Sequence, residues 1–167
     1  MEAVIVRHAD AGKADPRKYP DDALRPLSPE GEKEMRRVAR GMRKIDIEID
    51  HVFHSGYERA RQTALCICEA YEIDPNSIRV LKSLVPEAEP AKTASELRAL
   101  RDLSRVALVG HMPQLGRLIG YLVAGNTELQ LELKKGAACL LDVDRWSPGG
   151  ATISALLPPK ALRKLGK

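Results

Sequence analysis

Apolar residues follow two spacings along the chain, and these spacings predict its strands and helices. Compact, largely apolar runs predict strands at residues 3–7, 51–55, 78–81, 105–110, 137–143 and 151–157. Apolar positions that recur every three or four residues predict helices at residues 29–44, 57–71, 94–103 and 113–123. Polar stretches with prolines predict loops at 10–27 and 86–90, and no element is predicted in the short basic tail from residue 158.

The order of these elements is β-α-β-α-β-α-β-α-β-β, without an internal repeat or a linker. Strands that alternate with helices indicate an α/β fold, a three-layer α-β-α arrangement in which helices cover both faces of a mostly parallel sheet. The loop between the last two strands suits a hairpin, which adds an antiparallel strand. The 167 residues are therefore expected to form a single domain, 1–167, with its own core.

Three predicted strands end in residues that suit phosphate chemistry. The first delivers Arg7 and His8. Arg59 follows the second strand within the first turn or so of its helix, and the fourth strand leads into His111. Because ligands of open α/β sheets bind beyond the carboxyl ends of the strands, these side chains are expected to meet. Arginine forks match phosphate oxygens and a neutral imidazole can attack phosphorus, so the pattern predicts a phosphoryl site with His8 as nucleophile.

Each of these residues also has an ordinary structural interpretation. His8 can be a hydrogen-bonding residue at a strand end, Arg59 can belong to a charged helix face, and His111 can cap the helix that follows it. Their coincidence at three strand ends favours the phosphoryl site over these separate explanations. A metal site is not predicted, because His51 and His54 should point to opposite faces of a strand and no zinc or P-loop motif occurs.

Composition narrows the class of protein. The net charge is +4, which suits an anionic partner, but aromatic residues make up only 4% and no basic run is interleaved with them, so nucleic-acid binding gains little support. No apolar run is long enough to span a membrane, and the N-terminus lacks the pattern of a signal peptide. The three cysteines, Cys66, Cys68 and Cys139, have no framework spacing and are expected to be buried thiols. We therefore expect a cytoplasmic protein.

Three blocks of sequence resemble the signature of the histidine phosphatase superfamily, also called phosphoglycerate-mutase-like. Arg7-His8-Ala9 resembles its Arg-His-Gly, with alanine in place of glycine. Residues 55–63, Ser-Gly-Tyr-Glu-Arg-Ala-Arg-Gln-Thr, resemble its Ser-Pro-x-x-Arg-Ala-x-Gln-Thr, with glycine in place of proline. Gly110-His111 resembles its Gly-His after a late strand. The blocks stand in the family's order, and the short chain looks most like the small phosphohistidine phosphatases of the SixA type.

The resemblance implies a fold, an activity and a set of roles. His8 would take up the phosphoryl group, and Arg7, Arg59 and His111 would hold its oxygens without a metal or cofactor. SixA-type enzymes remove phosphate from histidine on signalling phosphotransfer domains, so a phosphorylated protein is the expected partner. A phosphatase for a small phosphate ester and a non-catalytic phosphoprotein-binding module are the alternatives.

The general acid is the least determined part of the predicted site. Many members of the family use a carboxylate in the loop after the third strand, and Glu87 stands in about that place. Glu89 and Asp10 are competing candidates, and Glu87 can equally be a solvated loop residue. A phosphoramidate nitrogen can be protonated before cleavage, so a phosphohistidine needs less help from an acid than an ester does.

Overall fold

The sheet of the computed structural model, which describes residues 1–100, 102–129 and 131–167, has six strands. In spatial order β3-β2-β4-β1-β5-β6, these are Arg79–Val80, His51–His54, Arg105–Gly110, Glu2–Arg7, Ala138–Val143 and Ala151–Leu157. The first four are parallel to one another. Strand β5 is antiparallel to both β1 and β6, so it alone of the six runs in the opposite direction, as the predicted hairpin requires.

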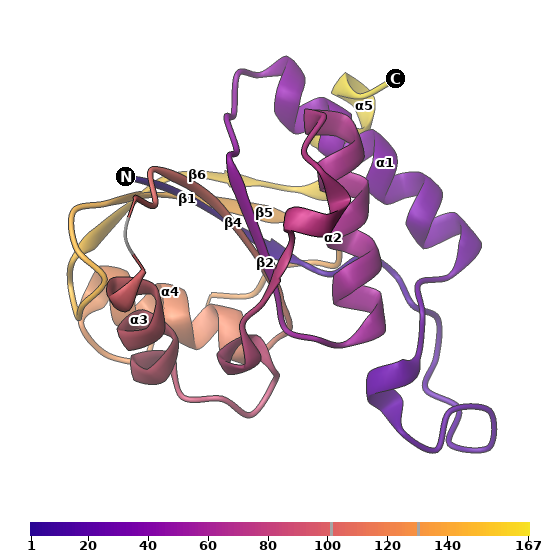
Figure 1. Cartoon of the computed structure of the whole chain (residues 1–167), viewed down its shortest axis with the longest axis horizontal. Helices are drawn as coiled ribbons and strands as arrows, with labels where there is room; N and C mark the ends of the chain where they lie inside the picture. Colours follow the sequence, from indigo (N-terminus) through magenta and orange to yellow (C-terminus); the bar gives the residue numbers. More distant parts are fainter. Residues whose placement is uncertain (101, 130) are drawn as a thin grey trace.

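Helices cover both faces of this sheet (Figure 1). Helices α1 (Pro29–Lys44), α2 (Glu58–Tyr71) and α5 (Pro159–Leu165) enclose one core, and α3 (Pro90–Ala99) and α4 (Gln114–Ala124) the other. Strand β1 shows why the central strands are apolar throughout: Ala3 and Ile5 belong to one core, whereas Val4 and Val6 belong to the other. The predicted three-layer α-β-α fold is thereby confirmed.

Local capping explains where the helices begin. The Ser28 hydroxyl accepts a hydrogen bond from the Gly31 N–H, and Pro29 occupies the first turn of α1, as the sequence predicts. The predicted helix at 94–103 is wrong in its bounds, and its residue 101 lies outside the described residues. Helix α3 begins at Pro90, because a proline is favoured at a first helical position. It ends at Ala99, after which Leu100 is extended.

The basic tail forms a helix that the sequence did not predict. Leu162 of α5 is fully buried, and α1 receives it at Gly41, where a Cβ atom would lie 2.1 Å from the Leu162 carbonyl oxygen. A seven-residue helix carries too little apolar periodicity to be recognised without this contact. Further short 3-10 helices lie at Asp22–Leu24, Pro75–Ser77 and Lys82–Leu84.

All three cysteines are free and buried, as expected. Burial raises the pKa of Cys66 and of Cys68 to about 11 and that of Cys139 to about 12, so these thiols stay protonated and unreactive at neutral pH. None of the helices in the described part of the chain has the length and apolar composition needed to span a bilayer.

Candidate active site

The carboxyl ends of β2, β4 and β1 lie side by side, because β4 is the strand between the other two. The pairing of Arg7 with Gly110 continues into a hydrogen bond of 3.0 Å from the His8 N–H to the Gly110 carbonyl. His8 and His111 consequently follow the ends of adjacent strands, and their ring centroids are 4.9 Å apart. The predicted meeting of the two histidines is present.

His8 is held as a neutral imidazole. Its Nδ1 lies 2.7 Å from the Ala9 carbonyl oxygen, which can only accept, so Nδ1 carries the proton and Nε2 keeps its lone pair. Burial lowers the pKa of His8 to about 4. The hydrogen bond to Ala9 raises this pKa, whereas the positive charges of Arg59, Arg7 and Lys135 lower it further. His8 as a whole is only 7% exposed. At neutral pH, Nε2 can therefore act as a nucleophile.

His111 is buried beside it with one nitrogen bound. Its Nε2 lies 2.7 Å from the Ser55 hydroxyl, whereas its Nδ1 is buried and has no hydrogen-bond partner among the described residues. Burial lowers the pKa of His111 to about 2, and the neighbouring His8 and Arg59 contribute. The ring of Tyr57 packs 4.7 Å from that of His111, centroid to centroid. His111 is thus a fixed, neutral imidazole with one free nitrogen.

The two arginines are fixed in the same way. Arg7 Nη1 donates to the Leu133 carbonyl at 2.7 Å. Arg59 is 5% exposed; its Nη1 donates to the Asp22 carbonyl at 2.7 Å, and its Nη2 lies 3.0 Å from the Asp22 carboxylate. In both side chains Nε is buried, and no group in the described part of the chain accepts a hydrogen bond from it. An oxyanion could accept hydrogen bonds from both of these Nε–H groups.

Unsatisfied polar atoms concentrate in this place. Within the described residues, five buried side-chain nitrogen or oxygen atoms lack a hydrogen-bond partner, and three of them belong to Arg7, Arg59 and His111. A buried polar group without a partner is costly, and such groups are rare in folded proteins. Their concentration around His8 therefore indicates a site built to receive a ligand with several acceptor atoms.

Asp10 is unsuited to be the proton donor. Its carboxylate lies 2.7 Å from Lys135 Nζ and accepts hydrogen bonds from the Ser28 hydroxyl and the Gly12 N–H, each at 3.0 Å. These contacts, led by that of Lys135, lower the pKa of Asp10 to about 2. Asp10 is consequently ionised at neutral pH, and it links the start of α1 to the segment before β5.

Glu87 and Glu89 differ in their surroundings, although both are exposed on the loop before α3. Glu89 forms an ion pair of 3.0 Å with Arg117. Glu87 lies close enough to Tyr57 that its charge, after burial, helps to raise the pKa of the Tyr57 hydroxyl. Because the Tyr57 ring packs on His111, the charge of Glu87 acts on a residue that lines the site.

Several contributors were not predicted from the sequence. Tyr57 stands between Ser55 and Arg59 and could have been found from that position alone. Asp22 begins a short 3-10 helix and Lys135 lies in a loop, and no sequence pattern marks either of them. Leu133 contributes to the site through its backbone carbonyl. The motif residue Thr63 has a scaffolding role, since its hydroxyl accepts from the Ala9 N–H and donates to the Arg59 carbonyl.

The chain is similar in sequence to proteins of a known family. A family model described as the histidine phosphatase superfamily, branch 1, matches residues 3–84. Phosphohistidine phosphatase SixA of Escherichia coli is 29% identical over 144 residues, which cover 85% of this chain and 86% of that protein. The chain belongs to the histidine phosphatase superfamily. Within this superfamily the chain is of the SixA type in sequence and in fold.

Two further relatives are similar over most of their length. An uncharacterised protein of Picosynechococcus sp. is 33% identical over 138 residues, 81% of each chain. A solved structure of the protein histidine phosphatase SixA complexed with tungstate superposes with a TM-score of 0.83 at 27% identity and covers 97% of this chain and 99% of that one. The similarity extends well beyond the half of the chain that the family model matches.

Proposed function

We propose that this protein hydrolyses phosphohistidine on a phosphotransfer protein through a covalent intermediate on His8. One observation carries the proposal: Arg7, Arg59 and His111 each have one end held by the protein and another nitrogen left buried around His8 without a partner among the described residues. The similarity to a phosphohistidine phosphatase of Escherichia coli supports the substrate. The similar SixA structure holds tungstate, an oxyanion with the oxygen arrangement of phosphate, which supports the site.

The proposed reaction has two steps. Nε2 of His8 forms a bond to phosphorus while the bond between phosphorus and the substrate imidazole breaks. The departing nitrogen takes the electron pair of that bond, and the imidazole, already protonated on its other ring nitrogen, leaves as a neutral ring. Water then attacks the phosphorus on His8, phosphate leaves, and Nε2 regains its lone pair. Arg7, Arg59 and His111 stabilise the charge on the phosphoryl oxygens in both steps, so the scheme calls for no metal or cofactor.

The poor supply of proton donors favours a phosphoramidate substrate. Asp10 is held ionised by Lys135, and Glu89 is engaged with Arg117. A leaving imidazole can be protonated before the bond breaks, whereas an alkoxide needs a proton during the step. A site without a well-placed acid therefore discriminates in favour of phosphohistidine. The free, buried cysteines support a reducing compartment, and we include the cytoplasm in the proposal.

Trapping the intermediate tests this function. The wild type, mixed with a phosphorylated histidine phosphotransfer domain and quenched in base, is expected to carry an acid-labile phosphoryl group on His8. His8→Ala should abolish turnover and still bind inorganic phosphate, whereas His51→Ala, at the far end of β2, should behave as the wild type. A wild type that forms no phosphoenzyme refutes the covalent mechanism and leaves the binding-module alternative. A clear preference for phosphate esters refutes the substrate.

The position of Glu87 favours a second candidate, hydrolysis of a small phosphate ester. Its charge reaches Tyr57, which lines the site, and an ester needs an acid there. If esters are the substrate, Glu87→Gln should lower kcat on an alkyl phosphate at least tenfold, the effect of losing a general acid, and should change kcat on p-nitrophenyl phosphate much less, because that leaving group departs without a proton. Glu89→Gln, which removes a neighbouring carboxylate that pairs with Arg117, is the matched control.

A further inference from the structure

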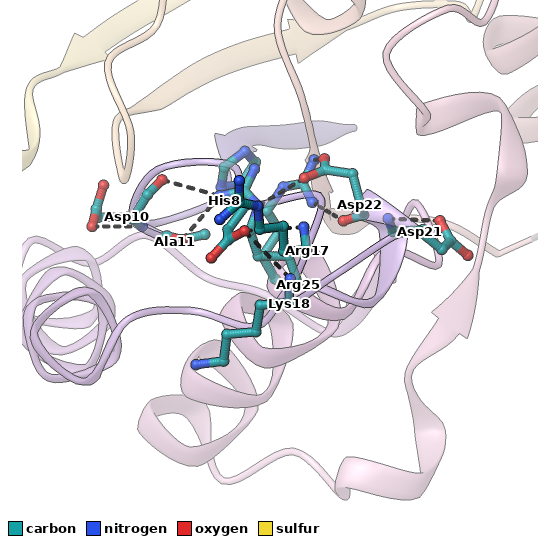
Figure 2. Close-up of polar contacts among 12 residues, drawn as sticks. His8, Asp10, Ala11, Arg17, Lys18, Asp21, Asp22 and Arg25 are labelled. Carbon is teal, nitrogen blue, oxygen red and sulfur yellow. Dashed lines mark hydrogen bonds and ion pairs between the residues drawn. The ribbon is translucent and has the colours of Figure 1, made fainter.

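Residues 11–25 form a loop that is closed at its base by one side chain. Arg25 Nη1 donates to the carbonyl oxygens of Ala11, at 2.9 Å, and Gly12, at 3.0 Å, which lie at the other end of the loop. Its Nε donates to one carboxylate oxygen of Asp22 at 2.7 Å (Figure 2). A surface loop whose ends are joined in this way is a compact unit and not a loose connection.

The same loop is tied to the phosphoryl site. The second carboxylate oxygen of Asp22 lies 3.0 Å from Arg59 Nη2, so one carboxylate joins Arg25 of the loop to Arg59 of the site. The Arg25 hydrogen bond, followed by the charges of Arg59 and Arg25, lowers the pKa of Asp22 and keeps it ionised. Figure 1 shows the loop projecting from the body of the molecule beyond α1 and α2. The base of the loop is therefore fixed beside Arg59 of the site, and its tip extends beyond the site on the same side of the molecule.

The tip carries unpaired positive charge. Lys13, Arg17 and Lys18 are all exposed, and none of them takes part in an ion pair within the described part of the chain. The one acid among them, Asp15, accepts hydrogen bonds from the backbone N–H groups of Arg17 and Lys18. Its carboxylate is thus directed to the backbone of the loop. Lys18 Nζ lies over the Tyr19 ring, 5.4 Å from its centroid, but Lys18 stays exposed, so all three cations can still meet a partner.

We propose that this cationic tip, residues 13–18, docks an acidic surface beside the phosphorylated histidine of the partner protein. The inference rests on the proposed function, because a docking surface at the tip is useful only if the phosphoryl group is attached to a protein. A small ester that fills only the site would not extend to the tip of a projecting loop. Charges arranged around a site in this way raise the rate of encounter and select among partners.

Two synthetic phosphohistidine peptides that differ only in glutamate or lysine flanks test the proposal. The wild type is expected to prefer the acidic peptide by about eightfold in kcat/KM, roughly twofold for each cation of the tip, and to lose this preference at high salt. A variant with Lys13, Arg17 and Lys18 changed to alanine should hydrolyse both peptides equally. Its activity on p-nitrophenyl phosphate should equal that of the wild type.

The matched control changes Lys44, Lys164 and Lys167 to alanine. Lys44 ends α1, Lys164 lies in the last turn of α5, and Lys167 follows that helix. Helix α1 is 16 residues, or about 24 Å, long from its start beside Asp10. The control should keep the preference for the acidic peptide. A wild type without the preference, or a tip variant that retains it, overturns the docking surface while leaving phosphohistidine hydrolysis intact. Hydrolysis of the ester but of neither peptide overturns both proposals.

Discussion

The neutral state of His8 is the property on which the proposed chemistry depends, and it can be measured directly. An unperturbed imidazole has a pKa of 6.5, whereas burial lowers that of His8 to about 4. A difference of about 2.5 in pKa means that protonating His8 in the fold costs about 3 kcal/mol more than in the unfolded chain. The lone pair of Nε2 therefore stays available well below neutral pH.

The sign of the pH dependence follows from this difference. Below pH 6.5 the unfolded chain binds a proton at His8 that the folded chain refuses until about pH 4, so the stability from this group is complete above pH 6.5 and falls as the pH is lowered to 4. At pH 4.5 the loss should be about 2.5 kcal/mol. In His8→Gln this contribution is absent, so its stability should fall less between pH 7 and pH 4.5. The acid limb of kcat/KM should lie near pH 4.

Titration of isotope-labelled histidine rings by NMR provides the assay. Lys135 adds to the lowering of the His8 pKa, so Lys135→Gln should raise that pKa, and the change also frees the carboxylate of Asp10. Lys134→Gln removes an equal charge from the neighbouring exposed position and is the control. A His8 that titrates at or above pH 6.5, or two lysine variants with the same effect, would refute the electrostatic reasoning.

Three further changes test the surroundings of the site. Asp22→Asn keeps the backbone contact but removes the charge from the guanidinium it holds; since Asp22 is 49% exposed, kcat/KM should fall only about fivefold, with Asp21→Asn as control. Leu162→Ala should lower the free energy of urea unfolding by about 3 kcal/mol, and Leu165→Ala, on the exposed side of the same helix, by under about 0.5 kcal/mol. Gly56→Pro should lower kcat/KM at least tenfold. A variant with the kcat/KM of the wild type would disprove this prediction.

The sequence was sufficient for the parts of the molecule that obey local rules. Ser28 and Pro29 mark the start of α1 by capping alone, and the run ending at Arg7 is apolar on both faces because two cores meet it. Placing His8 beside His111 needed one further rule, that parallel strands bring their carboxyl ends to one edge. Each of these inferences uses residues close in the chain and one general property of α/β sheets.

Long-range contacts supplied what the sequence could not. Lys135 reaches Asp10 across 125 positions of the chain, and the Leu133 carbonyl receives Arg7 across 126. The sequence around Leu133 and Lys135 has no periodicity or motif that predicts these contacts. Helix α5 likewise depends on a distant segment, because Gly41 of α1 makes room for the backbone of Leu162. Residues that position a site can thus escape prediction from the sequence even where the reacting residues are recognised from their motifs.

The two departures from the family's signature have different physical meanings. Ala9 serves through its backbone, since its carbonyl fixes His8 and its N–H donates to Thr63, and alanine supplies both groups as glycine would. Gly56 is a real change, because its φ of +95° is closed to proline, which is fixed near −65°. Its N–H also donates to Nδ1 of His54, a bond that proline could not form. The turn that leads to Tyr57 therefore depends on glycine in this chain.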